Sequence, residues 1–135
     1  MRGTLAALLA ALILAPCSGA AETAMTAEEF DAFSVGKTLE YTIDGQDYGS
    51  ESHLPGRRVI DADTGGPCHP GRWEPRGEDI CFVYDADPTT LHCWRYWRDG
   101  EGLLARAVGS APQDPPARVT VAAQPLVCPG PEVGV

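Results

Sequence analysis

The chain has 135 residues, five cysteines and a formal net charge of −9. This is the length of one ordinary domain. Its acidity argues against nucleic acid and anionic membrane surfaces as partners, because neither gains from binding a negatively charged protein.

The first twenty residues have the pattern of a secretory signal peptide (1–20). Arg2 gives a positive charge, residues 5–15 are an unbroken run of Leu, Ala and Ile, and small residues follow Pro16. The run is too short to span a bilayer, which takes about 20 residues. We expect cleavage after Ala20, with the position after Ala21 as the alternative, and release into the periplasm or the medium. A lipoprotein anchored at Cys17 is the alternative, but Pro16 departs from the small residue that precedes the cysteine of a lipobox.

One short helix is expected near the start of the mature chain. The sequence Thr26-Ala27-Glu28-Glu29 has the pattern of a capping box, in which the Thr and Glu side chains each bind a free backbone amide. Phe30 and Phe33 follow one turn apart, and Gly36 suits a helix end. The pattern predicts a helix over 27–34 whose two Phe side chains plug a core.

After the helix, apolar residues recur with the period of two that is typical of strands. Asp44-Gly45 is a strong hairpin signal, and turn residues then recur every ~8–12 residues, which favours an antiparallel meander. Glycines and prolines between residues 65 and 71 predict a loop that carries Cys68 and His69. The expected strands are 38–43, 46–52, 57–60, 72–75, 79–84, 93–98, 103–108 and 118–122.

These elements predict a mainly β fold. The antiparallel meander should form a small curved sheet or a partly open barrel, with one short N-terminal helix and two disulfides. We expect a single β-rich domain over residues 21–124 and an irregular tail over 125–135.

The cysteines predict a disulfide framework. Four remain beyond Cys17, namely Cys68, Cys81, Cys93 and Cys128, and an even number in a short exported chain allows three pairings. A hairpin over 79–98 with its tip at Asp87-Pro88 places Cys81 opposite Cys93, within reach of a bond. That leaves Cys68 for Cys128. A CxxC pair is missing, which argues against a zinc site.

The same register assigns the two faces of the hairpin. Alternate residues of a strand point to opposite sides. The core face is expected to carry Ile80, Phe82, Tyr84, Trp94 and Tyr96, and the opposite face Cys81, Val83, Cys93, Arg95 and Trp97.

Sequence motifs give little chemistry. We find no nucleophile elbow, P-loop or zinc-protease helix. His53, His69 and His92 lie in or beside predicted turns and are expected to be exposed loop residues. Residues 61–65 resemble the first half of an acidic calcium loop, but the distal Glu is missing, so a solvated turn is expected. We therefore predict no catalytic residue, no metal site and no cofactor.

Aromatic and basic residues supply the best ligand-binding candidates. Arginines stand out in an acidic protein, and they could stack on aromatic rings or hold a carboxylate. The alternative is core packing with surface salt bridges. The candidates are Trp97, Arg95, Trp73, Arg57 and Arg58.

Several segments resemble small exported proteins of alphaproteobacteria that have no established activity. The resemblance rests on residues 26–33, 36–39, 54–59 and 80–84 and on Cys93-Trp94. It implies an exported β-rich module and no catalytic residue. Size, export and β character are also similar to those of small disulfide-bonded periplasmic lysozyme inhibitors.

The sequence as a whole favours a non-catalytic periplasmic binding or inhibitor-like module, whose partner is a periplasmic protein or a small ligand. One alternative is a small hydrolase that uses histidine or a metal, and another is a structural protein of the cell envelope. Two histidines and an acid in one pocket would favour the enzyme. An open groove of aromatic and arginine side chains would favour the binding module, and a completely filled core with no groove would favour the structural role.

Overall fold

The computed structural model describes residues 22–129. The predicted signal peptide, including Cys17, and residues 130–135 of the predicted tail lie outside this range. Within residues 22–129, none of the helical structure is long and apolar enough to cross a membrane.

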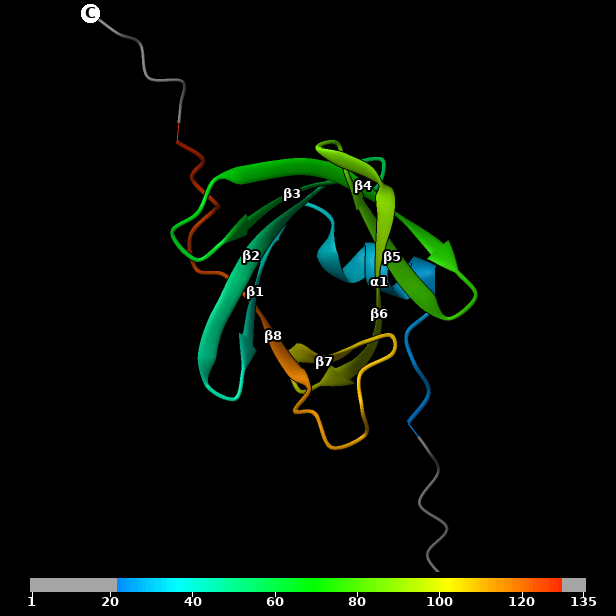
Figure 1. Cartoon of the computed structure of the whole chain (residues 1–135). Helices are drawn as coiled ribbons and strands as arrows, with labels where there is room; N and C mark the ends of the chain where they lie inside the picture. The colour runs from blue at the N-terminus through cyan, green and yellow to red at the C-terminus, as the bar shows by residue number, and fades with distance from the viewer. Residues whose placement is uncertain (1–21, 130–135) are drawn as a thin grey trace, which may run out of the picture.

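Eight strands follow a single short helix (Figure 1). Each strand pairs antiparallel with its neighbour in sequence, and β1 also pairs with β8, so the sheet closes on itself. Eight strands give a barrel whose interior is just wide enough to be filled by side chains. The elements are α1 (Ala27–Ser34), β1 (Thr38–Ile43), β2 (Gln46–Leu54), β3 (Arg58–Asp63), β4 (Cys68–Arg76), β5 (Asp79–Tyr84), β6 (Asp87–Asp99), β7 (Gly102–Ala107) and β8 (Ala117–Val121).

The predicted fold class is therefore confirmed, with one refinement: the sheet is a closed barrel. Closure comes from the ladder in which Leu39 pairs with Val121 and Ile43 with Ala117. This ladder removes both edges of the sheet, which would otherwise expose unpaired backbone groups.

Helix α1 covers one end of the barrel (Figure 1). Both hydrogen bonds of the predicted capping box are present: Thr26 Oγ1 accepts from the Glu29 amide at 3.2 Å, and the Glu29 carboxylate accepts from the Thr26 amide at 2.9 Å. Phe30 is fully buried, and Phe33 packs against the core while partly buried. The helix thus fills this end of the barrel chiefly with one Phe ring.

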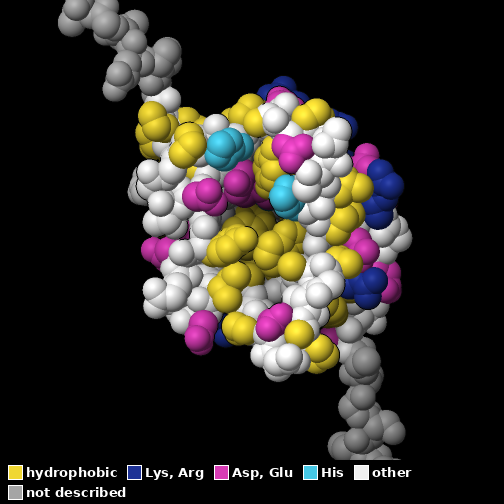
Figure 2. Space-filling view, viewed as in Figure 1, with side chains coloured by type: hydrophobic (Ala, Val, Ile, Leu, Met, Phe, Trp, Pro, Cys, Tyr) yellow, Lys and Arg dark blue, Asp and Glu magenta, His cyan; other side chains and the backbone are white. Residues whose placement is uncertain are grey.

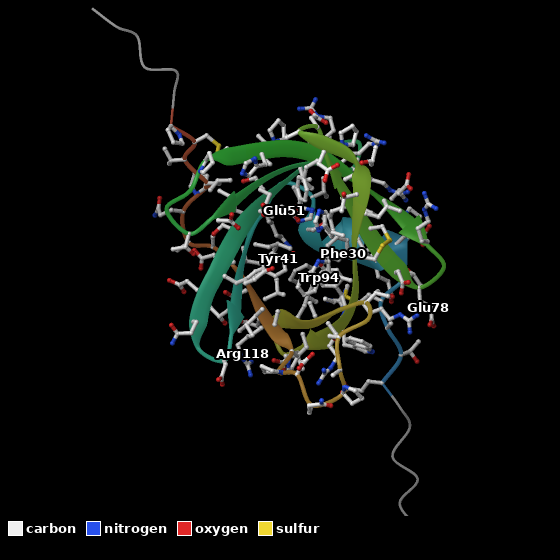
Figure 3. The ribbon with its side chains drawn as sticks, viewed as in Figure 1. Phe30, Tyr41, Glu51, Glu78, Trp94 and Arg118 are labelled. Atoms are coloured by element: carbon white, nitrogen blue, oxygen red, sulfur yellow. A yellow bond between two sulfur atoms is a disulfide. The ribbon has the colours of Figure 1, made fainter. Side chains whose placement is uncertain are left out.

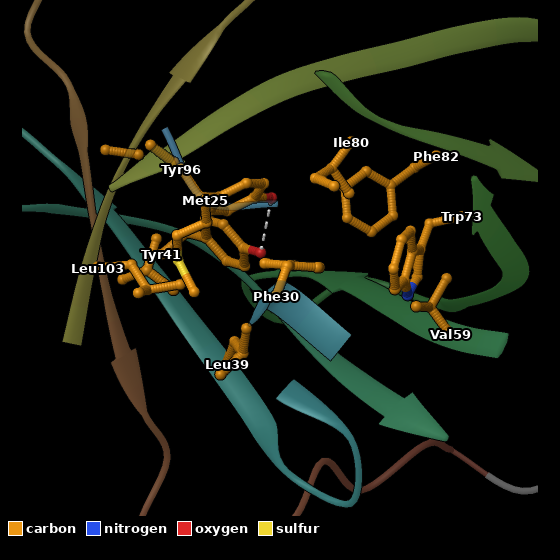
Figure 4. Close-up of a cluster of buried hydrophobic side chains, with 13 residues drawn as sticks. Met25, Phe30, Leu39, Tyr41, Val59, Trp73, Ile80, Phe82, Tyr96 and Leu103 are labelled. Atoms are coloured by element: carbon orange, nitrogen blue, oxygen red, sulfur yellow. Dashed lines mark hydrogen bonds between the residues drawn. The ribbon is translucent and has the colours of Figure 1, made fainter. Parts of the chain in front are cut away.

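The hydrophobic core surrounds Phe30 (Figure 4). The ring of Phe30 lies edge-on to Trp73, with centroids 5.3 Å apart, and 4.4 Å from the ring of Tyr96. Deeper in the barrel, the hydroxyls of Tyr41 and Tyr96 are hydrogen-bonded at 3.2 Å. The most deeply buried aliphatic residues are Leu39, Val59, Ile80, Leu103 and Val119.

The hairpin of β5 and β6 confirms the predicted register at its centre. Ile80 pairs with Trp94 and Cys81 with Cys93. The predicted tip at Asp87-Pro88 is wrong, because Tyr84 pairs with Asp87 and the turn lies at residues 85–86. The register of the two strands shifts at an irregularity between Phe82 and Tyr84. Because of this shift, Cys81 still pairs with Cys93 although the turn comes earlier in the chain than predicted.

The predicted loop around Cys68 and His69 is also wrong. Residues 68–71 belong to β4, where Ile60 of β3 pairs with Pro70. The last pair between β4 and β5 is Gly71 with Tyr84, so Pro70 lies where β4 has a ladder on only one side. Proline is tolerated at such a position because no second ladder needs its amide.

Both predicted disulfides are present. Cys81 is bonded to Cys93 across the hairpin, and Cys68 to Cys128 over a separation of 60 residues. The second bond attaches the segment after β8 to the start of β4. The Leu126 amide also donates to Thr38 Oγ1 at 3.3 Å, so part of the predicted tail is packed against the barrel.

Candidate functional site

A cavity of about 260 Å³ opens at one end of the barrel interior. In Figure 2 a hollow lined by hydrophobic side chains lies in the centre of the face shown, with acidic and histidine side chains above it. Figure 3 shows Glu51, Tyr41 and Trp94 within the ring of strands, whereas Glu78 and Arg118 lie outside it. The lining residues are Tyr41, Tyr48, Gly49, Glu51, Asp61, Asp63, Phe82, Tyr84, His92, Trp94 and Tyr96.

Three carboxylates reach this cavity from two neighbouring strands. Glu51 of β2 pairs directly with Asp61 of β3, and Gly49 pairs with Asp63. Directly paired residues of neighbouring strands point to the same face of a sheet, here the interior. Like charges placed opposite each other destabilise a sheet, and Glu51 is almost fully buried. The arrangement therefore costs stability in the empty barrel.

Glu51 is held by two neighbours. Its Oε2 accepts a hydrogen bond from the Tyr84 hydroxyl at 2.9 Å, and its Oε1 lies 3.1 Å from His53 Nε2. The His53 contact is close enough for an ion pair but lacks hydrogen-bond geometry, and neither ring nitrogen has another partner among the described residues. His53 is 2% exposed and does not line the cavity. It therefore supports the Glu51 carboxylate from within the core.

Gly71 makes room for the Tyr84 ring. A methyl group at Gly71 would clash with the Val83 carbonyl oxygen and would lie 2.8 Å from Cδ1 of Tyr84, so the glycine is needed both by the backbone of β5 and by the ring. The absence of a side chain lets the ring lie over β4 and direct its hydroxyl to Glu51. The backbone at Gly71 thus helps to fix one carboxylate of the cavity.

Aromatic rings form the walls of the cavity. The Trp94 ring lies 6.4 Å from the Tyr41 ring and 6.4 Å from the Tyr48 ring. Since Tyr48 is on β2 and Trp94 on β6, which are not neighbours in the barrel, their contact spans the opening. The rings of Tyr84 and His92 form another pair, with centroids 5.6 Å apart. A ligand in the cavity would meet ring faces and edges from several strands.

The surroundings of Asp61 favour its neutral form. Burial raises the pKa of Asp61 to about 6, and the charges of Glu51 and Asp63 add to this effect. His69, which pairs with Asp61 across β3 and β4, acts in the opposite direction. Burial and the nearby Glu51 charge likewise raise the pKa of the Tyr84 hydroxyl, which stays protonated and donates.

The five ligand-binding candidates from the sequence do not line this cavity. Trp73 is buried in the core, and the Arg57 guanidinium stacks on it from 4.7 Å. Arg95 contacts Asp79 and Glu78.

The remaining two candidates lie elsewhere on the barrel. Trp97 Nε1 donates to the Glu22 carbonyl at 3.1 Å, so the segment before α1 lies beside it. Arg58 is exposed at the start of β3. The five aromatic and arginine candidates are thus divided between the core and the outer surface.

Sequence reasoning missed the acids. Asp61 and Asp63 belong to β3 and are not a solvated turn, although Asp63 is exposed at the rim. The expectation of three loop histidines is also wrong, because all three lie in strands; His92 is exposed as expected, whereas His69 is half-buried and His53 is buried. The signal was available as alternation, since Val59, Asp61 and Asp63 share one strand face.

In residues 22–129, His, Cys, Asp and Glu side chains are nowhere grouped in threes in a way that could hold a metal ion. Comparison with known proteins gives no match to a protein-family model, a curated protein or a solved structure.

Proposed function

We propose that this protein is an exported, non-catalytic binding module that takes a small ligand into the open end of its barrel. The observation that carries the proposal is the cavity of about 260 Å³ with aromatic walls and a few polar groups. Small-molecule sites typically combine apolar walls with a small number of polar groups that orient the ligand, at about 300–1,000 Å³. The cavity lies just below this range, which favours a small ligand.

The chemistry of the lining favours binding over hydrolysis. Among the residues that line the cavity there is no serine, threonine or cysteine that could act as a nucleophile. Of the three histidines only His92 lines the cavity, since His53 lies behind Glu51, so the pocket does not combine two histidines with an acid. A purely structural envelope protein would have no need of an unfilled end with like charges in it.

Export is the second part of the proposal. Two disulfides persist in oxidising compartments such as the periplasm, and the first twenty residues have the pattern of a signal peptide. Mass spectrometry of the protein from a periplasmic fraction should find a chain that begins at Ala21 or Glu22. An intact Met1, or a lipid-modified Cys17 at the N-terminus, would contradict this part.

A fragment screen tests the binding function. Small aromatic compounds of positive, neutral and negative charge are added to the ¹⁵N-labelled mature protein, and amide shifts are mapped. Binding at the cavity should move the amides around Trp94 and be weakened in Trp94→Phe. Trp97→Phe is the matched control, since it changes the outer side of the same strand. Absence of any fragment from the cavity, or shifts confined to the surface at Trp97 and Arg95, would overturn the proposal.

A further inference from the structure

We infer that the ligand of this cavity is a small organic ammonium ion, a primary or secondary amine attached to an apolar or aromatic group. The inference rests on the proposed binding function and specifies its ligand class. It comes from the combination of uncompensated carboxylates with aromatic walls.

Charge balance is the first argument. Glu51, Asp61 and Asp63 all line the cavity, and its lining contains no Lys or Arg. Among the ion pairs of residues 22–129, none joins Asp61 or Asp63 to a basic side chain. A protonated His53 would balance only Glu51, and His69 offsets Asp61 only in part. A cleft of low-dielectric walls that carries one sign of charge concentrates ligands of the other sign.

The aromatic walls point to the same ligand. Tyr41, Tyr48 and Trp94 gather at one side of the cavity, and Tyr84 stands at another. Aromatic faces attract ammonium groups through the ring quadrupole, and Trp attracts them best. The carboxylates would accept the N–H donors of the ammonium, while the rings would surround its apolar part.

A buried histidine lies directly behind the Glu51 carboxylate. His53 is 2% exposed, and its ring nitrogens lack hydrogen-bond partners among the described residues although Glu51 is 3.1 Å away. Buried polar groups in native proteins are nearly always satisfied. The Glu51–His53 contact is thus close but lacks hydrogen-bond geometry.

The size of the cavity restricts the amine. At about 260 Å³ the cavity suits a single ring with a short chain rather than a peptide or a lipid. Phenethylamine is a suitable probe, because phenethyl alcohol and 3-phenylpropionate offer nearly the same shape with no charge and with negative charge.

The test measures binding of these three compounds to the mature protein by calorimetry and by the quenching of tryptophan fluorescence. Phenethylamine should bind about tenfold more tightly than phenethyl alcohol, which is the range of a partly desolvated ammonium–aromatic contact with charge attraction added. The propionate should bind most weakly. Asp61→Asn should remove most of the preference for the amine. Glu78→Gln is the matched control, because it removes one acid on the outside of the barrel (Figure 3) and should leave all three affinities unchanged.

The outcomes separate this inference from the proposed function. Equal binding of the amine and the alcohol within the cavity would overturn the ammonium ligand and leave a small-ligand module. Preference for the propionate would overturn it as well. Failure of all three probes would overturn the ammonium ligand, and the broader fragment screen alone would then decide the binding function.

Discussion

Asp61 should make the stability of the empty barrel depend on pH. Burial and the adjacent carboxylates raise its pKa from 3.8 to about 6 in the folded protein. Because the folded state holds this proton more tightly than the unfolded state, the stabilising effect is complete below about pH 4. It is lost as the pH rises to about 6, and above that the folded protein carries an unfavourable charge.

The magnitude follows from the shift. A difference of about two pKa units corresponds to an upper limit of ~3 kcal/mol at 1.36 kcal/mol per unit. Asp61 is partly open to solvent, so screening reduces this to about 1–2 kcal/mol. Asn cannot ionise and has nearly the same shape. Asp61→Asn should therefore be about 1–2 kcal/mol more stable than the wild type at pH 7, with little difference at pH 4.

Urea unfolding of both proteins between pH 4 and pH 7 measures this difference directly. Titrating groups far from Asp61 contribute equally to both proteins and cancel in the difference between the two curves, whereas the response of Glu51, Asp63 and His69 is part of the measured effect. Glu78→Gln is the control, because Glu78 is exposed on the outside of the barrel. The stability of this variant should change with pH in parallel with that of the wild type. A difference between Asp61→Asn and wild type that is constant with pH would refute the reasoning, as would a variant that is less stable at pH 7.

Three further predictions concern the frame around the cavity. Phe30→Ala removes a fully buried ring and should lower the free energy of unfolding by about 3–5 kcal/mol. Phe33→Ala, on the half-buried side of the same helix, should lower it by well under half as much. Equal losses would contradict the conclusion that this end of the barrel is filled chiefly by Phe30. Replacing Cys68 and Cys128 together by Ser should lower the free energy of unfolding by about 4 kcal/mol, because that bond closes a loop of 60 residues; unchanged urea unfolding would contradict this. Gly71→Ala should lower the free energy of unfolding in urea, because the new methyl would clash with the Val83 carbonyl oxygen as well as lie 2.8 Å from Tyr84 Cδ1, so β4 and β5 would have to move apart; a variant as stable as the wild type would show that the strands do not need this close approach.

The strands and the disulfides could be predicted because their signals are local. Alternation from residue 79 to 84 and from 93 to 98 specifies which side chains share a face, and a register slip of one residue would expose the whole apolar set. The pairing of Cys81 with Cys93 was predicted from a tip at Asp87-Pro88, and it is present although the turn lies at residues 85–86. The position of the turn was predicted wrongly because an irregularity in the ladder takes up extra residues without changing the register at the cysteines.

Closure and the cavity could not be predicted in the same way. The ladder between β1 and β8 joins residues about 80 positions apart, such as Leu39 and Val121, and nothing local marks it. The position of Asp61 and Asp63 in the cavity was not predicted, because acidic residues followed by glycines are typical of a turn. In the barrel Asp61 continues the face that begins at Val59. That face becomes the wall of a cavity only because β1 and β8 pair and close the barrel.

The two ends of the barrel differ in how they are filled, and this difference is the reason to expect a ligand. At one end α1 inserts Phe30 among Trp73, Phe82 and Tyr96, and these rings belong to one buried hydrophobic cluster. At the other end no helix enters among the described residues, and the interior positions carry carboxylates and tyrosines. Repulsion between those carboxylates lowers the stability of the folded protein. A bound cation would offset it, lower the pKa of Asp61 and stabilise the fold in proportion to ligand concentration.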